Sequence, residues 1–214
     1  MSPEDVARFL KANPQFFDQH PDVLEKLHVP HPHGGRAIPL AERQTVQLRD
    51  KLRVVEGRLG EIIQFGEEND VISEKVHRLA VALAGARDFP ALTQSLYFHL
   101  REDFAVPHVA VRIWGKSVPA DFAEAGPVDE VQRRQAEAMG APACGPALGN
   151  PFVGLFGEAA ERLRSLALVP LGQSSIFGLM ALASEDAKRF YPEMGTLYLR
   201  RIGELCAAGV TARL

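Results

Sequence analysis

Two apolar runs, Ser165-Leu-Ala-Leu-Val-Pro-Leu171 and Phe177-Gly-Leu-Met-Ala-Leu-Ala-Ser184, decide the fold of this chain. The stretch that contains them has no charged side chain, and its twenty residues are enough to span a bilayer. Pro170 and Gly172, however, interrupt it near the centre, where a membrane helix needs its backbone hydrogen bonds. Short apolar runs bounded by turn residues are typical of buried strands. We therefore predict two paired strands, Ser165–Leu171 and Ile176–Ala183, and no membrane span.

The flanking segments predict the other elements of an α+β domain. His108–Trp114 alternates as a strand does, with Val109, Val111 and Ile113 on one face. A helix precedes it, because Asp88-Phe89-Pro90 is a typical helix start. The remaining predicted elements are a polar helix over 127–139, a strand over 144–148 and a helix over 192–214. The sequence therefore predicts an antiparallel sheet with flanking helices.

The order of these elements resembles the GAF sensor fold. The residues that carry the resemblance are the two apolar runs quoted above and Arg189-Phe190, which leads into the last helix. Because many GAF domains share this strand–turn–strand signature, it implies the fold and names no ligand. The cyclic-nucleotide signature of some GAF domains is not found, so we carry over no nucleotide pocket.

Upstream of this domain, the residues from Pro39 to about Ala84 predict one long amphipathic helix. The segment has no internal proline, and its apolar residues recur at alternating steps of three and four. The step from Ile62 to Phe65 is a three where a four is due, so the seam contains a stammer. No charged residue interrupts the series, which is typical of a two-stranded coiled coil. The predicted dimer seam consists of Leu48, Leu52, Val55, Leu59, Ile62, Phe65, Asn69, Ile72, Val76, Leu79 and Leu83.

The length of this helix favours dimerisation over burial. Its forty-six residues would extend about 69 Å, more than twice the ~30 Å of a small domain, so the seam must meet another chain or fold back on itself. Gly57, Gly60 and Gly66 each weaken the helix by about 1 kcal/mol relative to Ala, which leaves a hairpin broken near Gln64–Glu67 as the alternative. We favour a homodimer because no proline or Asn-Gly turn marks a break. Asn69 is then either a polar seam residue that sets the register or a partly wet helix position.

The first 28 residues predict two or three short helices. Ser2, Pro3 and Asp5 form the pattern of an N-cap, a first helical position and a capping box. His28–Arg36 contains two prolines and a glycine pair, which predicts a connector without regular structure. The apolar face of the short helices is too large to remain in contact with water. We therefore predict a surface that docks a partner protein, formed by Phe9, Phe16, Phe17 and Leu24.

Motifs spread over nearly the whole chain identify a narrower resemblance. They are Asn13-Pro-Gln-Phe-Phe17, His20-Pro-Asp-Val-Leu24, Pro30-His31, Glu42-Arg-Gln44, Leu48-Arg49, Cys144-Gly-Pro146, Leu155-Phe-Gly157, and Phe190 followed by Pro192-Glu-Met-Gly-Thr196. With these motifs the chain resembles the bacterial family catalogued as domain of unknown function 484. The resemblance implies a short helical head, a long helix and a GAF-like C-terminal domain, and it implies no activity. The predicted domains are a head with its connector over 1–37, a dimerising helix over 38–85 and a GAF-like domain over 88–214.

A ligand pocket is predicted on the sheet face that Arg112 and Trp114 share. If the valines and the isoleucine of that strand face the helices, Arg112 and Trp114 face the opposite side, and segment 117–164 closes over them. One arginine in a concave apolar site suits a small ligand with an anionic group. The alternative is a filled core in which Arg112 pairs with Asp121 or Glu124. The predicted pocket residues are Arg112, Trp114, Phe122, Cys144, Phe152 and Phe156.

Two other groups of residues have side chains that suit a site. His28, His31 and His33 lie in the connector, but that loop holds no cysteine and no carboxylate to complete a metal site. Cys144 lies in the region where GAF domains bind ligands, and a GAF-fold reductase of free methionine sulfoxide works with several cysteines. Here the second thiol, Cys206, lies on a helix that we expect under the sheet, so no resolving partner is evident. We therefore predict no metal, no cofactor and no catalytic residue.

Composition and charge argue against several classes of function. The chain has 24 Lys and Arg against 27 Asp and Glu, and a net charge of −3 is unlike that of a nucleic-acid-binding protein. Two cysteines form no disulfide framework and indicate reduced thiols in the cytoplasm. The acidic N-terminus does not fit a signal peptide.

We expect a cytoplasmic, homodimeric and non-enzymatic regulatory protein that binds neither nucleic acid nor membranes. Its GAF-like domain would bind a small molecule or a protein partner, and the coiled helix would couple that event to the head. The alternatives are a protein–protein scaffold with a filled pocket and a Cys-based reductase.

Overall fold

The computed structural model describes residues 2–29, 38–114, 118–173 and 175–214, and the side chains of residues 24, 25, 29 and 38–42 lie outside what it describes. The chain divides into two compact units, residues 1–67 and 68–214, and the division falls within a helix. The domain limits predicted from the sequence, at 37 and at 85–88, follow the ends of the predicted long helix and not the compactness of the units. They stay a prediction.

A four-stranded antiparallel sheet forms the centre of the second unit. Its strands are β3 (His108–Ile113), β4 (Ala143–Pro146), β5 (Ser165–Leu171) and β6 (Gly178–Ser184), in the spatial order β3-β6-β5-β4. The predicted strand pair is therefore confirmed, with Leu168 opposite Ala181. The second strand begins at Gly178 rather than at the predicted Ile176, because residues before it belong to the turn that the amide of Phe177 closes on the carbonyl of Leu171 at 2.9 Å.

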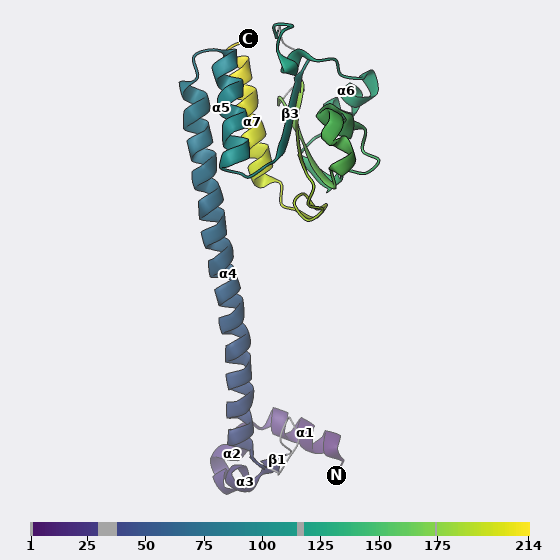
Figure 1. The fold of residues 1–214 in the computed structure, drawn as a ribbon. Helices are drawn as coiled ribbons and strands as arrows, with labels where there is room; N and C mark the ends of the chain where they lie inside the picture. Colours follow the sequence, from purple (N-terminus) through teal and green to yellow (C-terminus); the bar gives the residue numbers. More distant parts are fainter. Residues whose placement is uncertain (1, 30–37, 115–117, 174) are drawn as a thin grey trace. The chain divides into compact units, whose positions relative to one another are not determined.

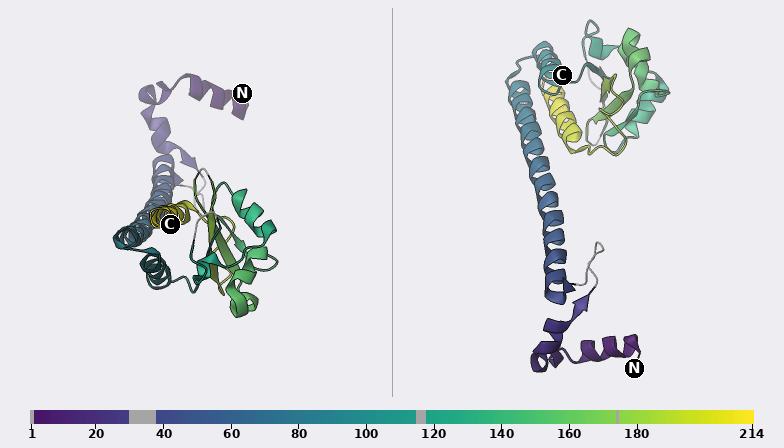
Figure 2. Two further views of the ribbon diagram at one scale, coloured as in Figure 1. Left: turned by 90° about the horizontal axis from the view of Figure 1, so that it is seen from above. Right: turned by 60° about the horizontal axis from the view of Figure 1, so that its bottom comes forward.

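Helices cover both faces of this sheet. The helices α5 (Phe89–Glu102) and α7 (Leu197–Thr211) lie on one face, with the last turns of α4 (Leu40–Gly85) beside them (Figure 1). On the opposite face lie α6 (Glu130–Glu137) and the 3-10 segment η2 (Pro151–Arg162), as two further views also show (Figure 2). The predicted fold class, an α+β antiparallel sheet with flanking helices, is confirmed.

The charge-free sequence of the central strands follows from this layering. Ala167, Val169 and Leu171 enter the core beneath α5 and α7, whereas Leu166 and Leu168 enter the smaller core beneath α6 and η2. A strand buried on both faces has no solvent side that requires polar residues, so it reads as a continuous apolar run.

Local signals set most helix ends. Asp88 caps α5 by accepting a hydrogen bond from the amide of Ala91 at 2.9 Å. The polar helix predicted over 127–139 is shorter, because the capping box of Asp129 begins it at Glu130. The last helix begins at Leu197 and not at Pro192, since the chain first makes a turn in which the amide of Met194 bonds to the carbonyl of Tyr191.

Short elements precede α4 in the N-terminal unit. They are α1 (Pro3–Ala12), α2 (Phe16–Gln19), α3 (Pro21–Lys26) and two paired strands of two residues, β1 (His28–Val29) and β2 (Ile38–Pro39). The predicted capping box of Ser2 and Asp5 is present. One prediction is wrong in part: His28, assigned to an irregular connector, pairs with Pro39 in a short ladder. Residues 30–37, with His31 and His33, lie outside the described residues.

The helix α4 is continuous from Leu40 to Gly85, which confirms its predicted length. The alternative, a hairpin broken near Gln64–Glu67, is not observed. Gly57, Gly60 and Gly66 remain within the helix, so their combined cost of about 3 kcal/mol is not enough to break it.

Candidate functional site

An apolar stripe on α4 is the most prominent exposed feature of the first unit. We call Leu48, Leu52, Val55, Leu59, Ile62 and Phe65 the α4 stripe; each side chain is between 55% and 66% exposed. Large apolar side chains repeated at three- and four-residue steps form one face of a helix. Such a face costs free energy in water, so the α4 stripe is a candidate contact surface.

The second half of the predicted dimer seam has a different place. Val76, Leu79 and Leu83 are 9% exposed or less and belong to the core of the second unit, with Ile72 packed against it. The prediction that these residues meet a second chain is therefore wrong, because α5 and α7 of the same chain already cover them. Asn69 offers its backbone carbonyl to the hydroxyl of Tyr198 at 3.0 Å. The periodicity is the same in both halves, but only the α4 stripe is left uncovered.

The six predicted pocket residues do not line one cavity. Trp114, Phe152 and Phe156 belong to the core on the α6 side of the sheet, as predicted. Phe122 and Cys144 instead pack against the core on the α7 side. The ring of Phe122 meets that of Phe89 at 5.3 Å, and Cys144 lies opposite Ala167 in the ladder. The predicted pocket is corrected to two separate sets of packing contacts, because Phe122 and Cys144 pack on the opposite side of the sheet from the other three residues.

Arg112 and Glu124 lie near the free edge of β3. Arg112 donates from Nη1 to the carbonyl of Val111 at 2.8 Å. Glu124 is 4% exposed and accepts a hydrogen bond of 2.6 Å from the hydroxyl of Tyr97. Burial, together with this carboxylate, raises the pKa of Tyr97 far above its ordinary value. In the alternative to the predicted pocket, Arg112 pairs with Asp121 or Glu124; in the structure the hydrogen-bond partner of Glu124 is Tyr97.

Trp114 is held at the surface by α6. Its Nε1 donates to Oε1 of Glu137 at 3.1 Å, and Arg133 donates to the same oxygen at 2.8 Å. The hydrogen bond from Arg133 is the main reason that the pKa of Glu137 lies below its ordinary value. Trp114 is therefore a packing residue with a fixed polar end.

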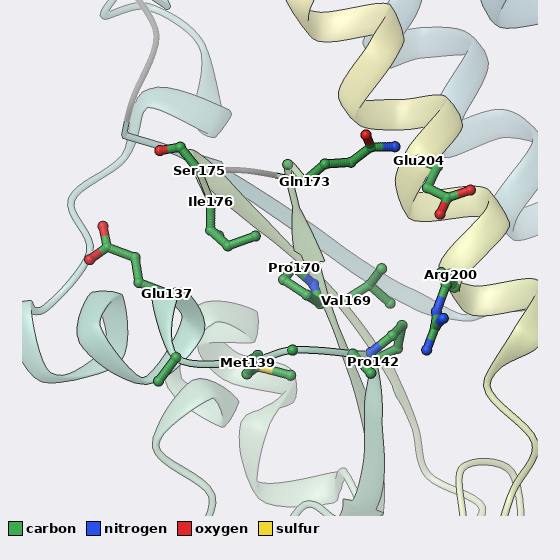
Figure 3. Close-up of a pocket in the computed structure, with 14 residues that line it drawn as sticks. Glu137, Met139, Pro142, Val169, Pro170, Gln173, Ser175, Ile176, Arg200 and Glu204 are labelled. Carbon is green, nitrogen blue, oxygen red and sulfur yellow. The ribbon is translucent and has the colours of Figure 1, made fainter.

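A cleft of about 690 Å³ opens beside β5 (Figure 3). We call it the β5 cleft. Strand β4 pairs with β5 only as far as Leu168, so the last residues of β5, including Val169 and Pro170, have a described neighbour strand on one side alone. The loop through Met139 and Pro142 forms one wall, and α7 forms the other. An unpaired strand edge offers backbone hydrogen-bonding groups to a ligand or an extended peptide.

Charged side chains surround the β5 cleft. Glu137 lies at one side, and Arg200 and Glu204 lie one turn apart on α7 (Figure 3). All three are exposed, so the cleft is polar at its rim. Sequence reasoning missed this site. The signal in the sequence was the turn at Gly172 and Gln173, two residues that line the cleft. That turn predicts a bend in the chain, but it does not predict that α7 lies beside the bend.

Neither cysteine has the environment of a nucleophile. Burial raises the pKa of the half-buried Cys144 thiol and raises that of the buried Cys206 to about 12. A raised pKa keeps a thiol protonated and unreactive at neutral pH. In the part of the chain that the structure describes, no three His, Cys, Asp or Glu side chains gather as a metal site would require.

The aromatic residues of the head form a small cluster. The ring of Phe16 makes edge-to-face contacts with Phe9 at 5.9 Å and with Phe17 at 5.4 Å. Phe9 is 51% exposed, whereas the other two are half-buried. The predicted docking surface is thus partly used for packing within the head, and the side chain of Leu24 lies outside those described.

Comparison with known proteins finds relatives that match almost the whole chain. The profile of the family described as "Protein of unknown function, DUF484" matches residues 1–211. The Uncharacterized protein YigA of Salmonella typhimurium is 22% identical over 204 residues, which cover 92% of this chain and 86% of that protein. The YigA protein of Escherichia coli is 23% identical over the same lengths.

Two solved structures are similar to part of the chain. A crystal structure of the A. aeolicus nlh2 GAF domain in an inactive state covers 68% of this chain and 99% of that one, with 15% identity and a TM-score of 0.46. The photosensory core module of a Stigmatella aurantiaca phytochrome covers 66% of this chain and 36% of that one, with 14% identity and a TM-score of 0.45. Among the helices of the described residues, none combines the length and apolar character needed to cross a bilayer.

Proposed function

The chain belongs to the family of proteins of unknown function DUF484, and from that premise we propose that it is a dimeric regulatory protein without catalytic activity. Two copies associate through the α4 stripe. The second unit binds an effector, either a small molecule or a protein partner, and the state of the dimer carries the signal to the head.

The α4 stripe is the observation that carries this proposal. Its six side chains are more than half exposed, and Lys51, Arg58 and Glu61 lie between them in the sequence, off the apolar series. An apolar seam with charged flanks is the pattern of a two-stranded coiled coil. Burying a Leu or Val side chain contributes about 1.5–3 kcal/mol. The stripe of a second copy would bury these side chains, which the single chain leaves exposed.

The effector site is proposed in the second unit because the end of α4 belongs to its core. Val76, Leu79 and Leu83 pack in that core, and the α4 stripe lies on the same helix. A ligand that favours one packing of these residues shifts the population of states available to α4. The β5 cleft, with its unpaired strand edge and polar rim, supports effector binding there.

Light scattering on the purified full chain tests the dimer. We expect a mass twice the 23.4 kDa of one chain, and about 23.4 kDa for Leu59→Glu, since a charge in an apolar seam is costly to bury. The matched control is Val54→Glu, which places the same charge on an equally exposed apolar residue, 55% exposed, outside the stripe. A monomeric wild-type chain, or a control that dissociates as readily, would falsify the proposal.

A scaffold function is the second candidate, and the Phe9–Phe16–Phe17 cluster favours it. Phe9→Ala removes the most exposed ring of the cluster. If a partner protein binds through the head, this change abolishes its capture and leaves the mass of the dimer unchanged. An effector that binds only the second unit is unaffected.

A further inference from the structure

A second hollow of the second unit lies between α4 and α7, away from the β5 cleft. Its volume is about 410 Å³, near the lower end of the ~300–1,000 Å³ typical of small-molecule sites. Most of its wall is apolar, and the side chains that form the wall are among the most buried of the chain: Leu100, Val106, Leu182, Phe190, Leu199 and Ile202. The interior therefore favours a hydrocarbon body over a polar one.

Cationic side chains also line this hollow. Lys75 and Arg189 line it, and both also line an adjoining surface hollow that contains Arg101. Asp186 is the acid of that surface, and its Oδ1 accepts a hydrogen bond from the amide of Lys188 at 2.9 Å. Among the described residues, the ion pairs include none of the three cations. These side chains thus carry positive charge that no ion pair among the described residues neutralises.

Arg189 is also left with an unused hydrogen-bond donor. Its Nη2 donates to the carbonyl of Phe104 at 2.6 Å, and its guanidinium lies 5.6 Å from the ring centre of Phe190. Its Nε is buried and has no partner among the described residues. A buried donor without a partner destabilises the fold. A guanidinium that lines an apolar cavity has the geometry to bind a carboxylate.

We propose that this hollow, the α4–α7 pocket, binds a small monocarboxylate with an unbranched hydrocarbon body. The carboxylate meets Arg189 and Lys75, and the hydrocarbon lies against Leu182, Phe190 and Ile202. A volume of about 410 Å³ suits one short chain and not the two acyl chains of a bilayer lipid, so the ligand is a free acid. This site goes beyond the proposed dimer, and binding to it does not depend on the dimer.

The position of the pocket gives the bound acid a direct effect on α4. Ile72 and Lys75 belong to that helix, whereas Tyr198 and Ile202 belong to α7. A ligand that contacts both helices stabilises the packing in which they are held together. This consequence, unlike the binding itself, rests on the proposed function, because it makes the acid an effector that acts from a site other than the β5 cleft.

Calorimetric titration of the full chain with sodium decanoate below its micellar concentration tests the pocket. We expect saturable binding, and an affinity that rises about fourfold for each methylene in the series from butyrate to decanoate. Decanol, which has the body without the charge, should bind at least tenfold more weakly. No saturable heat from decanoate, or equal binding of decanol, overturns the proposal.

Three variants place the ligand. Arg189→Gln and Lys75→Gln should each weaken decanoate binding about tenfold. Lys75 takes part in none of the described ion pairs, so Lys75→Gln should fold normally and serves as the test if Arg189→Gln does not fold. Lys188→Gln is the matched control, because Lys188 is exposed and does not line the pocket. An equal loss in the control overturns the site.

Vesicles distinguish a free acid from a membrane lipid. Sedimentation with phosphatidylglycerol vesicles should capture no protein. Capture that Arg189→Gln abolishes would assign the pocket to a bilayer and overturn the free acid. The mass of the dimer is measured separately, so a chain that dimerises but does not bind decanoate contradicts the pocket and leaves the dimer proposal intact. A monomeric chain that binds decanoate contradicts the dimer proposal and leaves the pocket intact.

Discussion

The hydroxyl of Tyr198 donates to the backbone carbonyl of Asn69 at 3.0 Å and so joins α7 to α4. The hydroxyl of Ser73 lies 3.0 Å from the hydroxyl oxygen of Tyr198 and donates to it, because the hydrogen of Tyr198 is used for Asn69. A helix carbonyl in the middle of α4 already accepts an intrahelical bond, so the tyrosine uses the second lone pair. This contact fixes the end of the helix pair that also borders the α4–α7 pocket.

Removing this hydroxyl should loosen the helix pair. We expect Tyr198→Phe to lower the free energy of unfolding by about 1–2 kcal/mol, because the hydrogen bonds to Asn69 and from Ser73 are both lost while the ring keeps its packing. Urea denaturation measures the change. Tyr191→Phe is the matched control, since Tyr191 is 48% exposed. Equal effects of both variants would show that the contact with Asn69 contributes nothing.

Gly203 lets α7 approach the sheet closely at Val169. A Cβ built there would lie 2.5 Å from Cγ1 of Val169, so Gly203→Ala should destabilise the second unit by about 1–3 kcal/mol through overpacking. Gly57→Ala is the opposite case, because no atom lies within 4 Å of its Cβ. That variant should stabilise the helix by about 1 kcal/mol. Thermal unfolding of both variants checks the signs, and a neutral Gly203→Ala would contradict the packing described here.

Sequence patterns predicted the elements of the second unit because the signals that set them are local. The apolar run of β5 and the cap at Asp88 depend on neighbours within a few residues, and both were confirmed. Contacts that arise from tertiary packing were not predictable in this way. Leu59 lies in the exposed stripe and Leu79 in a core, although both belong to the same apolar series. An apolar helix face predicts that something packs against it, but it does not predict whether the same chain or another chain does so.

The pocket prediction failed for a related reason. Alternation along β3 correctly placed Trp114 on the α6 side, since the period of a strand is fixed at two. Phe122 lies beyond the end of that strand, where no period applies, and it packs on the opposite side against Phe89. The β5 cleft depends on where β4 stops pairing with β5, which is a property of the sheet and of no single segment.

Asp103 should make the stability of the second unit depend on acid pH. The hydrogen bond from His99, at 2.6 Å, and then that from Arg78 hold the pKa of Asp103 below its ordinary value of 3.8. A carboxyl whose pKa is lower in the folded state adds stability above its unfolded pKa and loses it as the pH falls through the folded value.

The prediction follows from that sign. Between about pH 5 and pH 2 the free energy of unfolding should fall less steeply for Asp103→Asn than for the wild-type chain. Urea denaturation at several pH values measures the slopes. Asp22→Asn, which removes an exposed carboxylate of the head, should leave the slope of the second unit unchanged. Parallel curves for Asp103→Asn and the wild type would contradict the prediction.

The two thiols should differ in reactivity, and both should react slowly. Burial raises the pKa of the Cys206 thiol to about 12, with the charge of Glu124 as a smaller cause. Burial alone raises the pKa of Cys144, which stays half-buried at β4. The thiolate is the nucleophile in disulfide exchange. In such an assay at neutral pH, Cys144 should therefore react slowly, and Cys206 should react only after unfolding. Cys144→Ser leaves Cys206 as the one remaining cysteine and should abolish labelling of the folded chain. Rapid labelling of Cys144 in the wild type, at the rate of a free thiol or faster, would contradict the raised pKa of Cys144. It would also favour the alternative of a Cys-based reductase.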